Sequence, residues 1–202
     1  MSTKLDKPAP GNRNFVRIIG GGWRGRRVSF PDSPGLRPTP DRVRETLFNW
    51  LQHSIVDTCC LDLFAGSGAL GLEALSRGAR EVVFVEQAQA AARALQGELQ
   101  RLGGAARARV LELGAARFLR GAPETVGAPF DLVFLDPPFG RDALAEYVPL
   151  LARGDWLKPD SLVYIENERA AGVPELPPQW ELLKSKSAGE VGYHLARVSI
   201  RS

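Results

Sequence analysis

The 202-residue sequence lacks long apolar runs. No stretch approaches the roughly 18 apolar residues that a membrane-spanning helix requires. Residues 1–14 are polar and contain no apolar core of the kind found in secretion signals. We therefore expect neither a membrane-embedded nor a secreted protein, and the expected location is the cytoplasm.

Cysteine and histidine are scarce, with two residues of each. Cys59 and Cys60 are adjacent in an apolar run, so they cannot join distant parts of the chain. We expect two buried free thiols in a reducing compartment. No Cys/His cluster has the spacing of metal ligands, so no metal is predicted. His53 and His194 are expected to be structural or exposed.

The chain contains 44% apolar and 24% charged residues, which is ordinary for a globular protein. Its length suits one domain with a real core, with room for a small extension. The charge is uneven: residues 1–30 carry a net charge of +6, whereas the whole chain carries +3. A basic end on a slightly acidic body indicates a polyanionic partner, most simply nucleic acid.

The basic end is predicted to form a β-hairpin. Two short strands, at 15–19 and 26–30, flank three consecutive glycines that give freedom to turn. We expect a disordered basic tail over 1–14 and an RNA-contacting hairpin over 15–36, because arginines interleaved with an aromatic ring suit an RNA backbone. The alternative is a hairpin that only packs on the domain. The candidate RNA-binding residues are Arg17, Trp23, Arg24, Arg26, Arg27 and the following Arg37.

Residues 37–202 are predicted to be one α/β domain. Thr39 as N-cap and Pro40 as the first helical residue predict a helix with Val43, Leu47, Trp50 and Leu51 on one face. Strands and helices then alternate, which implies a mostly parallel sheet covered on both faces. The expected strands are 59–63, 82–86, 109–112, 132–135 and 162–166, the helices 69–77, 88–102, 115–120 and 142–152, and the closing antiparallel hairpin 180–185 with 193–200.

A glycine motif lies between the first strand and the first helix of this domain. Gly66, Gly68 and Gly71 satisfy G-x-G-x-x-G in that context. Glu86 ends the next strand, where an acid commonly binds both hydroxyls of a ribose. A dinucleotide such as NAD and S-adenosylmethionine both suit this pattern. Asp62 would repel a pyrophosphate but attract an ammonium and a sulfonium, so we expect the methyl donor. An NAD-dependent oxidoreductase is a distant alternative.

A second motif follows the apolar strand at 132–135. Pro137 and Pro138 cannot donate ladder hydrogen bonds, so a stiff loop begins at the carboxyl end of the strand, where open α/β sheets bind ligands. The Asp136 carboxylate and the Pro137 carbonyl could accept both hydrogens of an exocyclic amine, and Phe139 could stack on its base. Asp136, Pro137, Pro138 and Phe139 are the candidate catalytic residues. The alternative is an ordinary strand-to-turn junction.

Taken together, these motifs make the chain resemble the bacterial 16S rRNA (guanine(966)-N2)-methyltransferases, over about residues 17–198. The resemblance rests on the segments 17–21, 24–26, 37–49, 62–68 and 136–139. Many enzymes that methylate exocyclic amines share the last segment, and the arginine-glycine hairpin narrows the match. The resemblance implies a Rossmann-like, seven-stranded methyltransferase sheet and S-adenosylmethionine as donor. It also implies that the target is a guanine of 16S rRNA in an assembling small subunit.

One departure from that family concerns the donor site. Relatives usually carry Asp where Gly114 stands, and that acid hydrogen-bonds the adenine amino group. We therefore expect adenine recognition to rest on packing and on backbone groups such as the Ala115 N–H. The candidate donor-binding residues are Thr39, Asp62, Phe64, Gly66, Ser67, Gly68, Glu86, Gln87 and Ala115. Residues 166–168, after the strand at 162–166, are expected to face solvent.

Two other functions remain open. One is methylation of another nucleic acid, for example adenine N6, although the chain is short for a DNA enzyme that reads sequence. The other is a non-catalytic RNA-binding assembly factor on the same fold. The intact 136–139 loop, Asp62 and Glu86 argue against lost chemistry. No signal indicates oligomers, so a monomer is expected.

Overall fold

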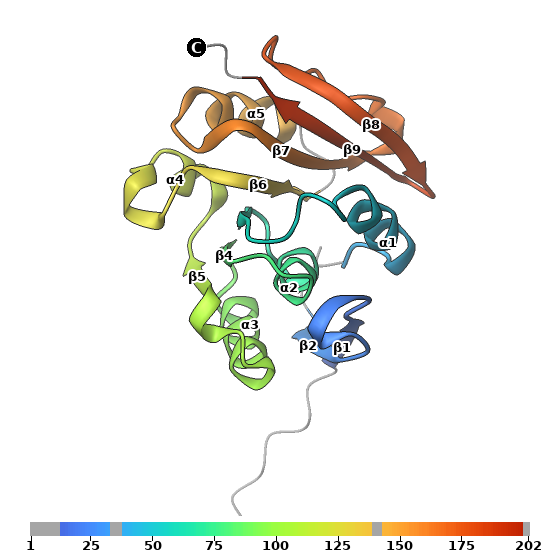
Figure 1. The fold of residues 1–202 in the computed structure, drawn as a ribbon, viewed down its shortest axis with the longest axis vertical. Coiled ribbons are helices and arrows are strands. Elements are labelled where there is room, and N and C mark those ends of the chain that lie inside the picture. The colour runs from blue at the N-terminus through green and yellow to red at the C-terminus, as the bar shows by residue number, and fades with distance from the viewer. Residues whose placement is uncertain (1–12, 33–37, 139–142, 200–202) are drawn as a thin grey trace, which may run out of the picture.

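The computed structural model describes residues 13–32, 38–138 and 143–199 (Figure 1). Residues 1–12, Arg37 and Phe139, to which the sequence assigned a tail, an RNA contact and a base contact, lie outside the described residues. Within the described part of the chain, no helix is long and apolar enough to cross a membrane.

A seven-stranded sheet forms the centre of the molecule. Its strands are β3 (Cys59–Asp62), β4 (Glu81–Glu86), β5 (Ala108–Glu112), β6 (Phe130–Leu135), β7 (Leu157–Glu168), β8 (Trp180–Ala188) and β9 (Val191–Val198). Their order is β5-β4-β3-β6-β7-β9-β8. The first five strands in this order are parallel, and β9 pairs antiparallel with both β7 and β8. The predicted α/β class and closing antiparallel hairpin are confirmed.

Helices cover both faces of the sheet (Figure 1). They are α1 (Asp41–Trp50), α2 (Ala69–Ser76), α3 (Gln89–Leu102), α4 (Ala115–Leu119) and α5 (Ala143–Arg153), with 3-10 turns at Gly21–Trp23, Ala105–Arg107, Pro123–Val126 and Arg169–Ala171. One hydrophobic cluster contains apolar residues of α1, α2 and α3, and a second contains those of α4 and α5. Because the sheet is buried on both sides, its parallel strands are nearly continuous apolar runs.

The amino-terminal hairpin consists of β1 (Arg13–Arg17) and β2 (Arg27–Pro31), paired antiparallel with Val16 opposite Val28. Strand β1 begins at Arg13, two residues before residue 15, where the hairpin was predicted to start. Val16, Val28 and Phe30 are buried in the same cluster as α2 and α3. The hairpin is therefore an integral part of the core as well as an extension of the domain.

The start of α1 differs from the prediction by one residue. Pro40 occupies the N-cap with an extended backbone, and the helix begins at Asp41. The hydroxyl of Thr39, which the sequence placed at the cap, instead donates to Asp136 Oδ2 at 3.3 Å. Val43 and Leu47 are fully buried, as the helical spacing predicts. Thr39 thus joins the start of a helix to the end of a distant strand.

Candidate active site

Acidic residues gather at the carboxyl edge of the parallel strands. Asp62 ends β3, Glu86 ends β4, and Asp136 directly follows β6. The register pairs Asp62 with Phe134, so the three acids come to one edge of the sheet. This edge is where open α/β folds bind their ligands.

The glycine turn lies over the same edge and requires its glycines for two reasons. Gly68 has a φ of +76°, a left-handed conformation that side chains disfavour. A Cβ on Gly71 would lie 2.2 Å from the Phe84 ring, so this glycine lets α2 approach β4 closely. The turn can therefore bring backbone amides against a ligand, as the motif predicts.

Glu86 is held in one orientation by backbone amides. Its Oε2 accepts from the Gly66 N–H at 2.8 Å, and its Oε1 accepts from the Ala88 N–H at 2.6 Å. The side chain is partly exposed, and each carboxylate oxygen has a second lone pair. Glu86 can therefore accept hydrogen bonds from two vicinal hydroxyls without reorganising.

Asp62 is a buried acid, only 2% exposed. Its Oδ2 accepts the Gly71 N–H in the first turn of α2 at 3.0 Å. The pKa of Asp62 is raised to about 7, chiefly by burial and also by the charges of Asp136 and Glu86, against the lowering effect of the Gly71 hydrogen bond. A cation bound beside this carboxylate would offset both the burial and the repulsion.

Asp136 has a similar proton affinity for the same main reason. Burial raises its pKa to about 7, against the lowering effect of the Thr39 hydrogen bond. The residue as a whole is partly exposed, so a ligand can reach it. Pro137 is buried and Pro138 is exposed, which fixes the direction of the chain after Asp136. A carboxyl with a pKa near 7 can accept a proton at neutral pH.

Gln87, Gly114 and Ala115 lie together beside this edge. A Cβ on Gly114 would lie 3.6 Å from Gln87 Oε1, and Ala115 is the first residue of α4. The Ala115 amide therefore belongs to the helical turn whose N–H groups have no acceptor within the helix.

Ser67, in the glycine turn, is buried. The Phe64 ring meets Tyr147 edge-on, with ring centroids 4.9 Å apart. All nine candidate donor-binding residues lie within the part of the chain that the structure describes. Thr39 is hydrogen-bonded to Asp136.

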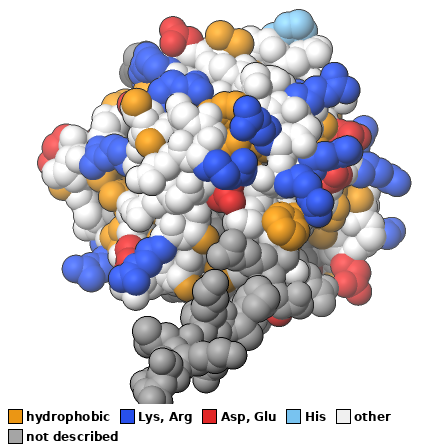
Figure 2. Space-filling model, turned by 90° about the horizontal axis from the view of Figure 1, so that it is seen from below, with side chains coloured by type: hydrophobic (Ala, Val, Ile, Leu, Met, Phe, Trp, Pro, Cys, Tyr) orange, Lys and Arg blue, Asp and Glu red, His pale blue; other side chains and the backbone are white. Residues whose placement is uncertain are grey.

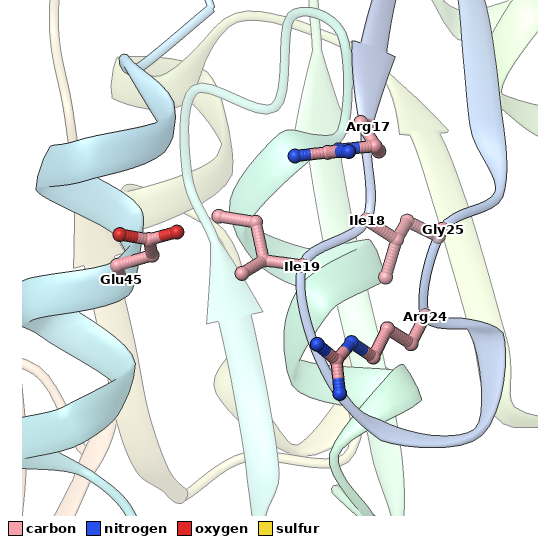
Figure 3. A pocket seen from close by; sticks show the side chains of 6 residues that line it. All are labelled: Arg17, Ile18, Ile19, Arg24, Gly25 and Glu45. Carbon is pink, nitrogen blue, oxygen red and sulfur yellow. The ribbon is translucent and has the colours of Figure 1, made fainter.

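The hairpin presents a basic surface. The side chains of Arg17, Arg24, Arg26 and Arg27 are all exposed. Figure 2 views the end of the molecule that carries the hairpin and α3, and Lys and Arg side chains predominate on it. Figure 3 shows Arg17 and Arg24 on one side of a small pocket, with Glu45 of α1 opposite them. The pocket has a volume of about 130 Å³, and its other lining residues are Ile18, Ile19 and Gly25.

Trp23 has a packing role within the chain. Its indole lies against Gly104, where a Cβ would approach to 2.5 Å, and the Arg107 guanidinium lies 5.6 Å from its ring centroid. Its backbone N–H donates to Ser76 Oγ at 2.9 Å. Trp23 therefore anchors the hairpin on the domain. For this residue, the packing role given above as the alternative to an RNA contact is the one that the structure shows.

A buried ion pair that the sequence did not predict joins Arg44 and Glu73, both with no exposed surface. The Glu73 carboxylate accepts the N–H groups of Ile19 and Gly20, each at 2.8 Å. Arg44 donates to the carbonyl oxygens of Thr39 at 3.1 Å and Arg17 at 2.9 Å. Glu73 is the one charged residue in the mostly apolar sequence of α2, and this is the feature of the sequence that could have indicated a buried ion pair.

The prediction that residues 166–168 face solvent is wrong for two of the three. Glu166 is 2% and Asn167 8% exposed, because β7 continues to Glu168 and is an interior strand of the sheet, between β6 and β9. Asn167 Oδ1 lies 3.2 Å from His194 Nε2, and burial lowers the pKa of His194. His194 is thus structural, and His53 is exposed, as predicted.

The comparisons with known proteins agree over nearly the full length. The family described as Conserved hypothetical protein 95 matches residues 16–197. The chain is 49% identical to ribosomal RNA small subunit methyltransferase D of Escherichia coli strain K12, over 95% of this chain and 94% of that protein. It is 46% identical to the Haemophilus influenzae protein of the same name, over 92% and 95%. The solved structure of Escherichia coli yhhF superposes with a TM-score of 0.84 at 47% identity, covering 92% of this chain and 99% of that one.

Proposed function

The chain belongs to the family of ribosomal RNA small subunit methyltransferases D, and on that premise we propose that it transfers a methyl group from S-adenosylmethionine to a guanine N2 amine in 16S rRNA. The family resemblance gives guanine 966 as the target. The proposed substrate is the assembling small subunit, and the proposed setting is a monomer in the cytoplasm. Two relatives at 49% and 46% identity carry names that specify small-subunit rRNA methylation.

The observation that carries the proposal is the acidic edge of the sheet. Burial and mutual repulsion raise the pKa of Asp62, so this site favours a ligand with positive charge. A dinucleotide would bring a pyrophosphate to the glycine turn, beside the same carboxylates. S-adenosylmethionine brings an ammonium and a sulfonium, and the residues present fit it: an acid before the turn, a glycine turn, and Glu86 oriented by two amides.

When bound, S-adenosylmethionine supplies an electrophilic methyl group on a positively charged sulfur. The remaining work falls to the chain. We propose that Asp136 and the Pro137 carbonyl accept the two hydrogens of an amino group and so orient the nitrogen lone pair. Asp136, with a pKa of about 7, can take the proton that the nitrogen loses on methylation. Phe139 is proposed to stack on the unpaired base.

We propose that the hairpin over residues 15–36 grips the RNA backbone. Arg17, Arg24, Arg26 and Arg27 are exposed and belong to one small element, which suits phosphate contacts that fix orientation. Arg37 is proposed to join them. Trp23 contributes by holding the arginine-bearing loop on α2 and α3.

The experiment that tests this function uses tritiated S-adenosylmethionine with undermethylated small subunits, naked 16S rRNA and duplex DNA. Label in N2-methylguanosine from the subunits is the expected result. Label as methyladenosine or only in DNA would support an enzyme for another nucleic acid. Donor binding without any transfer would support the assembly factor.

Asp136→Ala provides the matched control for chemistry. It should abolish transfer while donor affinity changes little, because its proposed contacts are with the target amine. A variant that turned over at the wild-type rate would contradict the role of Asp136. The exposed substitution Glu168→Gln serves as the reference for a harmless change of charge.

A further inference from the structure

Phe15 exposes an aromatic ring on the hairpin, and the function above gives it no task. The side chain is 51% exposed, whereas the other aromatic rings within residues 13–32, 38–138 and 143–199 are buried or half-buried. Val16 and Val28 face each other in the strand pairing and are buried. Because successive side chains of a strand point to opposite faces, Phe15 lies on the outer face of the hairpin. Single exposed apolar residues are common, so the surroundings of the ring decide what it can do.

Exposed arginines flank the Phe15 ring. The Arg27 guanidinium carbon lies 4.6 Å from the ring centroid, which is a cation–π contact. Arg17 faces Arg27 in the strand pairing, and both side chains are exposed. A flat apolar surface beside two cations suits a ligand that is itself flat and carries negative charge on either side. A nucleotide within a single-stranded segment has this form, with its base between two phosphates.

The strand beside the ring is held rigidly on α3. Ser29, which faces Phe15 in the pairing, donates its N–H and its hydroxyl to Glu98 Oε1 at 3.1 and 2.5 Å. Arg101 donates to the Arg27 carbonyl oxygen at 2.6 Å and forms an ion pair with Glu98. Glu98 is 8% exposed, so its charge is neutralised locally and does not oppose a phosphate near the ring. The surface is therefore preformed, and a ligand that binds to it pays little for ordering it.

We propose, given the rRNA methylation above, that Phe15 and Arg27 form a stacking platform for an unpaired base of the RNA outside the catalytic pocket. Aromatic rings and guanidinium planes are the side-chain groups on which unpaired RNA bases stack. The ring takes the base, and Arg17 and Arg27 take the adjoining phosphates. Stacking tolerates any base, so the platform fixes the register of the RNA and does not read its sequence.

The base on this platform differs from the target guanine. Arg44 is buried and donates to the carbonyl oxygens of Arg17 at 2.9 Å and Thr39 at 3.1 Å, and the Thr39 hydroxyl donates to Asp136. These side chains lie between β1 and the catalytic carboxylate, and Figure 1 shows α2 between the hairpin and the end of β6. The platform and Asp136 therefore meet two different nucleotides.

The first test measures methylation of undermethylated small subunits by Phe15→Leu and Phe15→Tyr. F15L keeps an apolar side chain but removes the π face, so KM for the subunits should rise about 5- to 50-fold while kcat and donor affinity change little. F15Y keeps the ring and should stay within about twofold of wild type. The matched control is Leu182→Ala, an exposed apolar position on β8 at the other end of the molecule (Figure 1). A wild-type KM in F15L would overturn the proposal.

Salt dependence separates stacking from charge. Phe15 releases no counterions from RNA, so F15L should keep the wild-type slope of log KM against log salt. Arg27→Gln should lower this slope by about one, because it removes one phosphate contact. If F15L lowered the slope as R27Q does, the ring would act only by placing Arg27, and the platform would be refuted.

A binding measurement without the methyl donor makes the test independent of catalysis. The probes are a short single-stranded oligoadenylate and an abasic ribose-phosphate oligomer of the same length and charge. Wild type should bind the oligoadenylate about 5- to 50-fold more tightly, and F15L should lose most of this preference. Equal affinity of wild type for both probes, or a preference that survives in F15L, would overturn the proposal. A raised KM in F15L with unchanged oligomer binding would overturn it in favour of a contact with a ribosomal protein.

The two measurements also distinguish the platform from the proposed function. Wild type that methylates no RNA, but whose preference for bases depends on Phe15, would refute the function and leave the platform established. Normal methylation with no effect of F15L on either measurement would refute the platform alone.

Discussion

At the scale of single residues, the site departs from ordinary protein surfaces because Asp62 and Asp136 form no ion pair with any described residue, that is within 13–32, 38–138 and 143–199. Asp62 and Asp136 have pKa values raised to about 7 chiefly by burial. Folding therefore works against their charged forms, and a cationic ligand recovers part of the free energy. Gly114 is the opposite case, a position where a polar side chain is missing although there is room for one.

Gly114→Asp should tighten the binding of S-adenosylmethionine by about 3- to 10-fold, the value of one added hydrogen bond of about 1 kcal/mol. Gly114 has a φ of −76° at the N-cap of α4, and a Cβ there meets only Gln87 Oε1 at 3.6 Å. An Asp is therefore accommodated and suits the helix start. Isothermal titration calorimetry measures the change. Gly114→Ala is the control, and equal affinities in the two variants would contradict the prediction.

Asp62→Asn should stabilise the protein at alkaline pH while weakening donor binding. The native pKa of about 7 exceeds the ordinary value of 3.8, so the native state binds more protons between these values. The free energy of unfolding therefore falls as pH rises from about 4 to about 7, and stays low above pH 7.

Asn removes this effect, so at pH 8 the variant should exceed wild type by about 2–4 kcal/mol, and at pH 4 the difference should be small. Urea denaturation at both pH values measures it. A gain that is the same at pH 4 and pH 8 would show that the charge of Asp62 is not its cause.

At the scale of elements, the hairpin is held by polar contacts beneath its apolar strands. Glu73 of α2 accepts two amides from the residues after β1, and Arg77 Nε also donates to it at 2.7 Å. Arg44 joins the hairpin backbone to Thr39, whose side chain reaches Asp136. The proposed RNA-binding element and the catalytic edge therefore share one buried cluster.

Glu73→Gln should lower the free energy of unfolding by about 2–3 kcal/mol, because it removes the buried counter-charge of Arg44 and leaves that guanidinium with the exposed Asp41 alone. Cleavage by trypsin within the hairpin should accelerate, since two backbone amides lose a charged acceptor. Glu181→Gln, an exposed change on β8, is the control. A variant that unfolds like wild type in guanidinium would argue against Glu73 as the anchor of the hairpin.

At the scale of the whole molecule, charge is divided between two regions. Among charged side chains, basic ones predominate on the face with the hairpin and α3 (Figure 2). The acids Asp62, Glu86 and Asp136 lie at the carboxyl edge of the sheet. The basic face suits a polyanion, and the acidic edge suits a cationic donor. The proposed RNA substrate and the proposed donor would therefore bind at regions of opposite electrostatic potential on one domain.

Charge reversal on the hairpin should weaken binding of the subunits in a salt-dependent way. For Arg24→Glu and Arg26→Glu, KM should rise by about 10-fold at low salt, and the slope of log KM against log salt should fall by about one for each lost contact. Donor affinity should not change. Arg197→Glu is the matched control, because Arg197 is exposed on β9 at the other end of the molecule (Figure 1). Equal effects at both ends would indicate a non-specific change of net charge.

The sequence by itself determined the order of the elements and the acids at the strand ends, because hydrophobic period, glycine spacing and prolines are local signals. Gly66, Asp62, Glu86 and Asp136 could be placed at one edge because parallel strands all end on the same side. Only the tertiary structure decided which residues share hydrogen bonds across elements. Long-range pairing made the end of β7, with Glu166, part of the sheet interior, paired Arg44 with Glu73 and directed the Thr39 hydroxyl to Asp136 in place of a helix cap. Burial of a charge depends on what packs over it, and that partner can lie anywhere in the chain.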